Sequence, residues 1–342
     1  MNDFLPTASL ENLRRRAQLL ERLRRFFHER HFWEVETPVL SQDTVVDRFL
    51  DPMAVPDPRH AATSQPASGF PPRPLWLQTS PEFGMKRLLA AGADAIFQVT
   101  RAFRCDEIGP LHNPEFTMVE WYRVGDTLAE GMQLLAELCE ALLSCGPPES
   151  ITYRDAFLRH LRIDPLTASL DALRQAAEDA AVIAPESLHA ASLQATDLPT
   201  REGLRDEWLH LLLAERVQPH LGRERPAILY HYPARQAALA RVVATPDPVA
   251  ERFELYVHGM ELANGYHELL DADQLADRQR AANADRLRDG KPTLPEDNRL
   301  LAAMRQGLPP CAGVALGFDR LAMVALGATH IEQVIAFPFP RA

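Results

Sequence analysis

The sequence predicts pairs of antiparallel strands together with separate amphipathic helices, a combination typical of an α+β fold. Residues 96–103 predict an alternating strand, and residues 116–122 predict a second one. A further alternation covers 253–258 and ends at a predicted turn. Apolar residues recur instead at helical spacing in residues 10–30 and 128–143. We therefore expect one long hairpin and one shorter hairpin, with helices elsewhere in the chain.

Composition limits the classes of protein to which the chain can belong. Its 342 residues, 46% of them hydrophobic, are enough for one large domain or two ordinary ones. No apolar run approaches the roughly 20 residues that span a bilayer, and the polar start lacks a signal-peptide core. The net charge of −11 argues against broad, nonspecific nucleic-acid binding. The spacing of the cysteines is not that of a metal or redox site, which predicts free thiols in the cytoplasm: Cys105, Cys139, Cys145 and Cys311.

Residues 75–92 predict a short strand, a turn and a helix. Ser80 is the expected N-cap, Pro81 fits the first helical turn, and the carboxylate of Glu82 gains from the helix dipole. Capping alone would explain Ser80. The preceding residues 56–74 contain six prolines and little apolar pattern, which predicts a surface loop.

A loop rich in polar side chains joins residues 96–103 to 116–122, and Gly109 and Pro110 mark a turn within it. It carries Arg104, Asp106, Glu107, His112 and Asn113. An arginine in such a loop suits a phosphate, because its planar fork can bond two oxygens at once. The alternative is a charged hairpin tip that is merely solvated.

The second hairpin is expected to turn at His258 and Gly259. The predicted register pairs Val257 with Met260, Tyr256 with Glu261 and Glu254 with Ala263. Glu254 and Glu261 then share one sheet face, where two carboxylates suit magnesium, although solvation alone would also explain them. Strict alternation places Glu268 on the other face, and a bulge near Asn264 and Gly265 would bring it round.

Residues 313–327 predict a strand of small residues that meets a helix near Asp319. Gly317 would let a ligand approach the backbone closely. Arg320 lies at the expected helix start, where a positive charge is unfavourable against the helix dipole. A phosphate or adenine partner therefore explains Arg320 better than stability does.

These segments resemble the motifs of one enzyme family, the class II aminoacyl-tRNA synthetases. Residues 31–41, HFWEVETPVLS, resemble motif 1, a helix end followed by a strand that stops at Pro38. Residues 97–122 resemble motif 2, and their run HNPEFTMVEWY narrows the resemblance to the lysyl branch, while 313–327 resemble motif 3. The resemblance implies an α+β class II catalytic core, an antiparallel β-sheet flanked by helices, in a homodimer.

The resemblance also implies one synthetase-like catalytic domain over residues 1–342. Motif 1 is placed at about 24–41, motif 2 at about 96–122, a mainly helical insertion at about 125–250 and motif 3 at about 311–327. Since motif 1 begins within the first 40 residues, we expect no anticodon-binding OB domain. Two further features are the run GMELANGYHEL and Ala315, which stands where the family usually has glycine. With the expected absence of the OB domain, they make the chain resemble the stand-alone lysyl-tRNA synthetase paralogues that attach (R)-β-lysine to translation elongation factor P.

Roles for individual side chains follow from the same resemblance. Arg104 and Arg320 would clamp the ATP phosphates and are the expected catalytic residues. ATP would further contact Cys105, Asp106, Glu107, His112, Asn113, Phe116, Glu261, Leu262 and Gly317; Asp106 stands where glutamate is usual, so Asp106 or Glu107 would meet adenine. The amino acid would contact Ser80, Pro81, Glu82, Tyr122, Glu268 and Ala315. Magnesium is expected on Glu254 and Glu261.

The implied reaction is ATP- and Mg²⁺-dependent activation of β-lysine as an acyl-adenylate, followed by its ligation to a lysine amine of elongation factor P. A lysyl-tRNA synthetase-like aminoacylation is the main alternative, although the negative net charge argues against bulk tRNA as acceptor. An ammonia-dependent asparagine synthetase has a substrate without a distal ammonium for Tyr122 and Glu268 to bind. A regulatory paralogue would have lost ATP-handling residues, whereas this chain keeps Arg104, Glu261 and Arg320. No membrane partner is expected.

Overall fold

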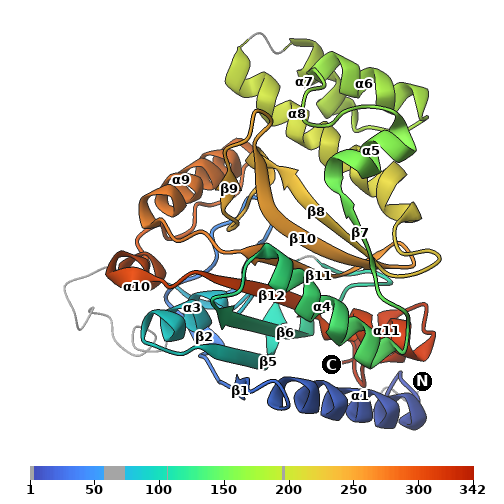
Figure 1. The fold of residues 1–342 in the computed structure, drawn as a ribbon, viewed down its shortest axis with the longest axis vertical. Helices are drawn as coiled ribbons and strands as arrows, with labels where there is room; N and C mark the ends of the chain where they lie inside the picture. Colours follow the sequence, from blue (N-terminus) through green and yellow to red (C-terminus); the bar gives the residue numbers. More distant parts are fainter. Residues whose placement is uncertain (1–3, 58–73, 106, 195–196) are drawn as a thin grey trace. The chain divides into compact units, whose positions relative to one another are not determined.

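The computed structural model describes residues 4–57, 74–105, 107–194 and 197–342 and divides the chain into two compact units. The first unit combines residues 1–126 with 270–342, and the second comprises 127–269. Figure 1 labels the elements of each unit along the chain. In the described part of the chain, no helix is long and apolar enough to cross a membrane. Asp106 and most of the predicted proline-rich loop lie outside the described residues.

The sheet of the first unit is built on the long hairpin that the sequence predicts. β5 (Ala95–Phe103) and β6 (Glu115–Val124) pair antiparallel along their whole length, and β12 (Cys311–Gly317) pairs antiparallel with β6. β1 (Trp33–Glu34) runs parallel to β5. The two predicted strands are confirmed, and helices flank the sheet as an α+β fold requires (Figure 1).

Helix α1 (Leu10–His28) begins after Ser9, whose Oγ accepts a hydrogen bond from the Asn12 backbone N–H at 3.1 Å. The helix buries Leu19, Leu23, Phe26 and Phe27. Helical spacing predicts an apolar face of Leu13, Ala17, Leu20, Leu23 and Phe27. This prediction is only partly right, because Ala17 is exposed. Phe27 stacks on Phe97 of β5 with 4.7 Å between ring centroids, which packs α1 against the sheet.

The predicted strand that stops at Pro38 is shorter than expected. Only β1 precedes Pro38, and the next strand belongs to a second, three-stranded sheet. That sheet has the order β2 (Leu40–Ser41), β4 (Leu75–Leu77) and β3 (Ala54–Val55). Between the two sheets the Thr37 hydroxyl donates to Gln98 Oε1 at 3.0 Å, so a side chain holds this segment to β5 where a backbone ladder was expected.

The remaining helices of the first unit surround these strands. They are α3 (Glu82–Ala90), α9 (Ala272–Arg288), α10 (Arg299–Gly307), α11 (Phe318–Leu326), and the short η4 (Ile331–Gln333) and η5 (Phe339–Arg341). α10 packs against α3 and α9, and α11 packs against β6. The strand followed by a helix that residues 313–327 predict is confirmed by β12 and α11.

Strands of the second unit follow the order β11, β10, β8 and β7, with β9 beside β10. Their bounds are β7 (Glu149–Thr152), β8 (Ala227–Pro233), β9 (Val242–Val243), β10 (Val249–Val257) and β11 (Met260–His267). The helices are α4 (Leu128–Leu143), α5 (Tyr153–Leu161), α6 (Leu170–Asp179), α7 (Glu186–Gln194), α8 (Leu198–Leu212), η1 (Leu213–Val217), η2 (Gln218–His220) and η3 (Ala234–Gln236). The prediction of a helix at 128–143 is confirmed. The prediction that the insertion at about 125–250 is mainly helical is right for α4 to α8 and misses the strands β7, β8 and β9.

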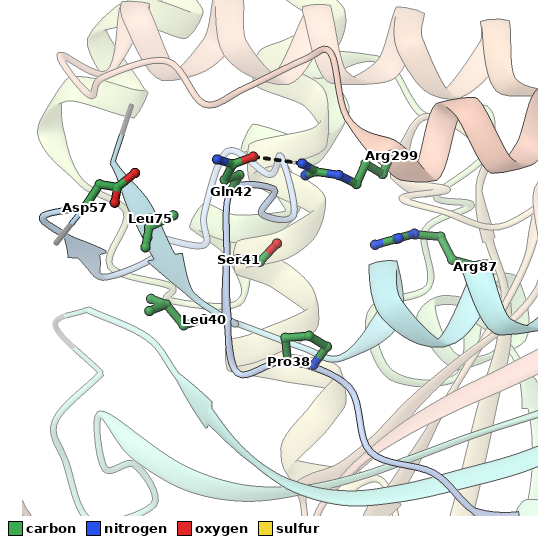
Figure 2. A pocket seen from close by; sticks show the side chains of 8 residues that line it. All are labelled: Pro38, Leu40, Ser41, Gln42, Asp57, Leu75, Arg87 and Arg299. Atoms are coloured by element: carbon green, nitrogen blue, oxygen red, sulfur yellow. Dashed lines mark hydrogen bonds between the residues drawn. The ribbon is translucent and has the colours of Figure 1, made fainter. Parts of the chain in front are cut away.

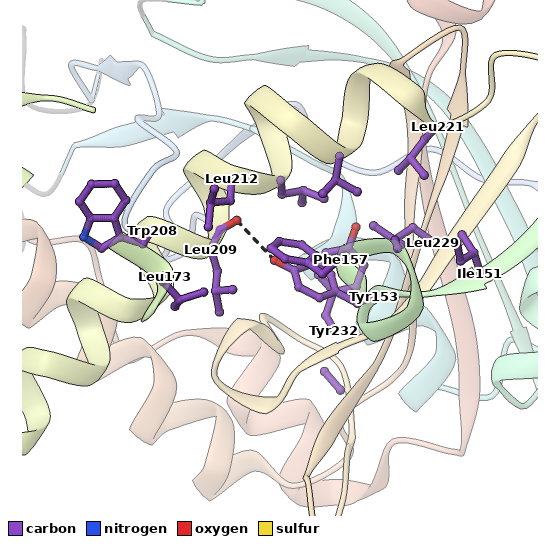
Figure 3. Close-up of a cluster of buried hydrophobic side chains, with 14 of the residues drawn as sticks. Ile151, Tyr153, Phe157, Leu173, Trp208, Leu209, Leu212, Leu221, Leu229 and Tyr232 are labelled. Atoms are coloured by element: carbon purple, nitrogen blue, oxygen red, sulfur yellow. Dashed lines mark hydrogen bonds between the residues drawn. The ribbon is translucent and has the colours of Figure 1, made fainter. Parts of the chain in front are cut away.

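An aromatic and aliphatic cluster forms the core of the second unit (Figure 3). Tyr153 stacks on Phe157 with 4.6 Å between ring centroids and lies 4.9 Å from the ring of Tyr232. Trp208 is buried, and its indole N–H donates to Ser192 Oγ at 2.8 Å. These contacts give the predicted insertion a hydrophobic core of its own.

His258 and Gly259 form the predicted two-residue turn between β10 and β11, with φ angles of 54° and 77°. Positive φ at both central residues is the geometry of a type I′ turn. Starting from the turn, the observed pairs are Val257↔Met260, Tyr256↔Glu261, Leu255↔Ala263 and Glu254↔Asn264. The first two pairs confirm the predicted register, and the last shows that the predicted pairing of Glu254 with Ala263 is wrong.

A β-bulge explains the change of register. Leu262 is an extra residue on β11, so Glu254 pairs with Asn264. Asn264 therefore lies on the sheet face that carries Glu254 and Glu261. Because side chains alternate along a strand, Glu268, four residues further on, lies on that face too. The predicted bulge is present, but it lies at Leu262, closer to the turn than Asn264.

Candidate active site

A buried carboxylate, Glu120, is the centre of a polar cluster in the first unit. Ser80 Oγ donates to Glu120 Oε2 at 2.8 Å, and the Tyr122 hydroxyl donates to Oε1 at 2.6 Å. Glu120 and Tyr122 are two residues apart on β6, so their side chains leave the same face of the sheet. Ser80 and Tyr122, both predicted substrate contacts, are thus brought together by an acid that the sequence analysis did not single out.

Helix α3 adds a buried ion pair to this cluster. Lys86 Nζ lies 2.5 Å from Glu82 Oε1, and the two side chains are only 2% and 8% exposed. Lys86 Nζ is also 5.9 Å from the centroid of the Tyr122 ring. Pro81, not Ser80, occupies the N-cap position, because the helix begins at Glu82. Ser80 Oγ nevertheless accepts the Glu82 backbone N–H at 3.0 Å, so it still serves this helix end.

The surroundings of Glu120 favour its protonated form. Burial raises the pKa of Glu120 to about 7, and the nearby charge of Glu82 acts in the same direction. Hydrogen bonds from Tyr122 and Ser80 and the charge of Lys86 oppose this shift. A further cation placed beside Glu120 would stabilise its ionised form. The cluster therefore suits a ligand that carries an ammonium group.

Strand β12 supplies the neighbouring part of the same sheet face. Ala315 is paired directly with Glu120, and Gly313 with Tyr122. Directly opposed residues of antiparallel strands have Cβ atoms about 4.5–5.5 Å apart, so the Ala315 methyl lies beside the side chain of Glu120. Gly317, a predicted ATP contact, pairs with Met118 and adds no side chain to this face.

Arg104 begins the loop that carries most of the predicted ATP contacts. Its Cζ lies 5.0 Å from the centroid of the Phe116 ring, and its Nη1 is 3.5 Å from Glu107 Oε1. The next residue, Cys105, donates its backbone N–H to Asp51 O at 2.8 Å. Three predicted ATP contacts, Arg104, Glu107 and Phe116, therefore lie together.

Arg320 reaches from α11 to the same loop. Its Nη2 lies 2.5 Å from His112 Nε2. Burial lowers the pKa of His112, and the charge of Arg320 lowers it further, which keeps the imidazole a neutral acceptor. Asn113 is buried and engaged with the protein: its Nδ2 donates to Glu115 O at 2.6 Å, and its Oδ1 accepts the Phe339 backbone N–H at 2.8 Å.

In the second unit, Glu254 is the centre of a buried network. Its Oε1 accepts from Arg252 Nη2 at 2.5 Å, and its Oε2 accepts from the hydroxyl of Tyr232 at 2.5 Å and from that of Tyr256. Such partners compensate the cost of burying a carboxylate. Within the described ranges, no three acidic, histidine or cysteine side chains gather closely enough to hold a metal ion.

The other predicted residues of the second unit follow from the bulge. Glu261 and Glu268 share the face of Glu254, as described above. Glu268 is 1% exposed, whereas Glu261 is half-buried. Leu262 is buried at the bulge itself. The bulge thus places the three predicted carboxylates on one face of this hairpin.

A surface pocket of the first unit lies among other residues (Figure 2). Its lining is Pro38, Leu40, Ser41, Gln42, Asp57, Leu75, Arg87 and Arg299. Arg299 donates to Gln42 Oε1 at 2.8 Å and pairs with Asp43 at 3.0 Å, so its charge is balanced within the protein. None of the predicted site residues lines this pocket.

Glu120 and Lys86 are the candidate residues that sequence reasoning missed. The signal for Glu120 was present, because it stands two residues before Tyr122 in an alternating strand and must share its face. Lys86 stands four residues after Glu82 on a predicted helix, the spacing of an ion pair. Burial of both side chains is the additional fact that the structure supplies.

Comparison with known proteins identifies the class to which this fold and this cluster belong. Residues 3–341 match the family model described as tRNA synthetases class II (D, K and N), and the chain belongs to that family. Among curated relatives, it is 45% identical to a protein of Salmonella arizonae named elongation factor P–(R)-β-lysine ligase. It is 46% identical to a protein of the same name in Salmonella typhi. Each match covers 98% of this chain and 98% of the relative.

Proposed function

We propose that this protein is an ATP-dependent ligase that activates (R)-β-lysine and joins it to a lysine side chain of translation elongation factor P. Family membership and the names of relatives matched over 98% of both chains support this function. The structural observation that carries the substrate class is the buried pair of carboxylates, Glu82 and Glu120. Lys86 pairs with Glu82, while two neutral hydroxyl groups donate to Glu120.

A diamino acid fits this arrangement for electrostatic reasons. An ammonium group beside Glu120 would offset the cost of ionising a buried carboxylate. An analogue with a methyl group in place of that ammonium would leave Glu120 without the ligand's cation and would favour its protonated form, so we expect the analogue to bind more weakly. Tyr122 and Ser80 would orient the carboxylate through the hydrogen bonds that they already donate.

The first chemical step forms the acyl-adenylate. A carboxylate oxygen of β-lysine attacks the α-phosphorus of ATP, the bond to the β-phosphate oxygen breaks, and pyrophosphate leaves with the electron pair. We assign Arg104 and Arg320 to the phosphate oxygens, where their charge offsets the negative charge that develops. Catalysis then depends on positioning and charge neutralisation, without a nucleophile from the protein.

The second step forms the amide bond. The unprotonated amine of the acceptor lysine attacks the carbonyl carbon of the adenylate, and AMP leaves with the electrons of the carbon–oxygen bond. The attacking nitrogen loses one proton. Glu120 and Tyr122 would keep the ammonium of β-lysine bound throughout, which holds the carbonyl in place.

Magnesium is proposed as the metal, with Glu261 among its ligands. It would supply positive charge to the nucleotide phosphates. Glu254 fits this role poorly in the geometry described, because Arg252 pairs with one oxygen and two tyrosine hydroxyls donate to the other. Arg252 would also repel a second cation at that carboxylate.

Further proposals concern organisation and location. A homodimer and a single catalytic domain over residues 1–342 follow from the resemblance to class II synthetases. Glu268, a predicted contact of the amino-acid substrate, is proposed to bind one of its ammonium groups. The described cysteines, all of them free thiols, fit a cytoplasmic location.

Two assays in sequence test the proposed function. Pyrophosphate exchange is measured with (R)-β-lysine, α-lysine and aspartate, and we expect β-lysine to give the highest kcat/KM. Transfer of labelled β-lysine is then measured to elongation factor P, to the same factor without its acceptor lysine, and to bulk tRNA. Labelling of intact elongation factor P alone is expected. Comparable labelling of tRNA would favour a tRNA synthetase, and exchange with aspartate alone would favour an asparagine synthetase.

A further inference from the structure

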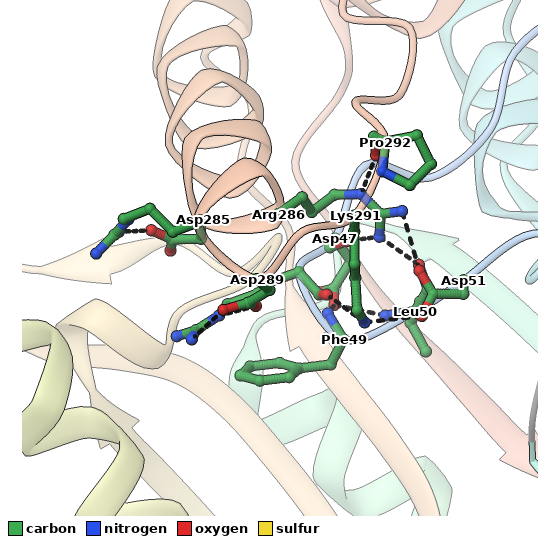
Figure 4. Close-up of polar contacts among 11 residues, drawn as sticks. Asp47, Phe49, Leu50, Asp51, Asp285, Arg286, Asp289, Lys291 and Pro292 are labelled. Atoms are coloured by element: carbon green, nitrogen blue, oxygen red, sulfur yellow. Dashed lines mark hydrogen bonds and ion pairs between the residues drawn. The ribbon is translucent and has the colours of Figure 1, made fainter. Parts of the chain in front are cut away.

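Residues 47–51, here called the strap, lie against the C-terminal end of α9 (Figure 4). The strap also contacts the start of the loop that carries Arg104, because Asp51 O accepts the Cys105 backbone N–H. Within the strap, Asp47 Oδ1 accepts the backbone N–H of Phe49 at 2.7 Å and that of Leu50 at 3.2 Å. An aspartate that bonds the backbone two residues further on stabilises a turn. The strap therefore has a defined local conformation of its own.

Arg286 of α9 binds the strap through two backbone carbonyl groups and one side-chain carboxylate. Its Nη1 donates to the carbonyl oxygens of Asp47 and Leu50, each at 3.0 Å, and its Nη2 lies 2.9 Å from Asp51 Oδ1. Its Nε donates to Pro292 O at 2.9 Å. All three guanidinium nitrogens thus have partners within the protein, which a charged side chain needs when it is only 1% exposed. A lysine in this place could not match the planar fork.

Two further ion pairs fix the strap to the same end of α9. Lys291 Nζ lies 2.7 Å from Asp51 Oδ2, and Arg48 binds Asp289 through two nitrogens at 2.7 and 2.9 Å. Partial burial raises the pKa of Asp51, but hydrogen bonds from Lys291 and Arg286 outweigh this and lower it. Asp51 is therefore ionised at neutral pH and pairs with both cations.

The strap in turn fixes the backbone beside Arg104. Asp51 O accepts the Cys105 backbone N–H at 2.8 Å, and the Arg104 backbone N–H donates to Pro114 O at 2.9 Å. The amides on both sides of the Arg104 Cα are thus anchored. One of the two anchors depends on the position of Asp51, and that position depends on Arg286.

We propose that Arg286 is a positioning residue for Arg104: it fixes the strap, whose Asp51 carbonyl sets the backbone from which Arg104 reaches the nucleotide phosphates. This inference rests on the proposed role of Arg104 in binding ATP. Removing Arg286 takes its hydrogen bonds away from two carbonyl groups and one carboxylate oxygen of the strap and from the carbonyl of Pro292, so the strap loses its fixed position. Small displacements of a phosphate-binding group reduce both affinity and rate.

The test compares two variants at the same end of α9. Arg286→Met removes the guanidinium, whereas Arg288→Met removes an arginine that is 67% exposed and pairs only with Asp285 among the contacts described. In pyrophosphate exchange, we expect Arg286→Met to raise the KM for ATP about tenfold and to leave the KM for β-lysine within about twofold. Arg288→Met is expected to match the wild-type protein. Arg286→Lys should have a defect close to that of Arg286→Met.

A second variant keeps the test decisive if Arg286→Met does not fold. Asp51→Asn removes the charge that Arg286 and Lys291 bind and keeps the carbonyl that Cys105 needs, and it should raise the KM for ATP without a matching change for β-lysine. A wild-type KM for ATP in a folded Arg286→Met or Asp51→Asn protein overturns the proposal. Equal increases for both substrates also overturn it, since they indicate a general structural defect. Failure of the wild-type protein to exchange pyrophosphate would instead refute the proposed function.

Discussion

Ala315 lies directly opposite Glu120 in the antiparallel register of β12 and β6. The methyl group of Ala315 therefore stands on the same sheet face as the buried carboxylate, between Gly313 and Gly317, which carry no side chain. Class II synthetases usually have a third glycine at this position. This chain instead places a methyl group beside Glu120, the carboxylate that we assign to the substrate ammonium.

Replacing Ala315 by glycine should change which isomer of lysine is preferred. Removal of the methyl group opens space beside Glu120, so we expect kcat/KM for α-lysine to rise relative to that for β-lysine. One methyl group in a binding pocket is worth about 1–3 kcal/mol, which corresponds to a change of at least fivefold in the ratio. Pyrophosphate exchange with both amino acids measures this ratio.

Ala312→Gly is the matched control, because Ala312 lies on the same strand but on the opposite sheet face. It should leave the ratio of the two isomers unchanged. An unchanged ratio in Ala315→Gly would assign the β-preference to other residues, of which Ser80 and Glu82 are the next to vary.

Arg104→Ala should abolish adenylate formation. Arg104 is assigned to a phosphate contact that strengthens in the transition state, and loss of such a donor costs about 100- to 1,000-fold in kcat. Pyrophosphate exchange measures this loss directly. Arg101→Ala is the control, since Arg101 lies on β5, the strand that leads into the Arg104 loop, is exposed and pairs with Glu115 at 3.5 Å. Undiminished exchange in Arg104→Ala would remove this residue from the nucleotide site.

Gly222→Ala should destabilise the protein more than a glycine replacement without a steric clash. Gly222 has φ of +69°, and a Cβ there would lie 2.3 Å from the carbonyl oxygen of Tyr256. Backbone strain and overpacking together predict a loss of about 2–5 kcal/mol in the free energy of unfolding. Gly290→Ala has a similar φ of +74° with no atom within 4 Å, so it isolates the backbone strain, about 1–2 kcal/mol.

Urea unfolding of the two variants measures the difference between them. Equal losses of stability would show that the structure relaxes around an alanine at position 222 without cost. A larger loss for Gly222→Ala would confirm that the backbone at Gly222 and β10 approach each other as closely as the structure shows.

Sequence reasoning succeeded where the pattern is local. The two segments that predict strands pair over the whole length of β5 and β6, and the glycine of His258–Gly259 marks the two-residue turn that the structure has. α1 shows the limit of this reasoning: apolar residues occur at neighbouring positions, such as Leu19 and Leu20, so two helical faces were possible. The structure buries the face with Leu19 and Phe26, which only tertiary packing determines.

The features that were not predicted depend on long-range partners. Ser80 and Glu120 are 40 residues apart in the chain, and Arg286 and Asp51 are further apart still. No periodicity specifies such contacts. The bulge at Leu262 was also misplaced, because a leucine fits a regular strand as well as a bulge and the turn alone does not fix the register beyond it.

Glu120→Gln should change how stability depends on pH. Burial and the charge of Glu82 raise the pKa of Glu120 from 4.5 to about 7, so between these values the folded state binds more protons than the unfolded state. The stability that protonated Glu120 contributes is therefore complete below about pH 4.5 and is lost as the pH rises through about 7. A shift of this size corresponds to at most about 3 kcal/mol.

Glutamine resembles the protonated acid and does not ionise, so the variant should match the wild-type stability near pH 5 and exceed it near pH 8. Free energies of unfolding from urea titrations at both values measure this effect. Glu115→Gln is the control on the same strand: its side chain is 54% exposed, and we expect no change in the pH dependence. If wild type and Glu120→Gln lose the same stability between the two pH values, Glu120 does not titrate in this range and the electrostatic argument for its role in binding an ammonium fails.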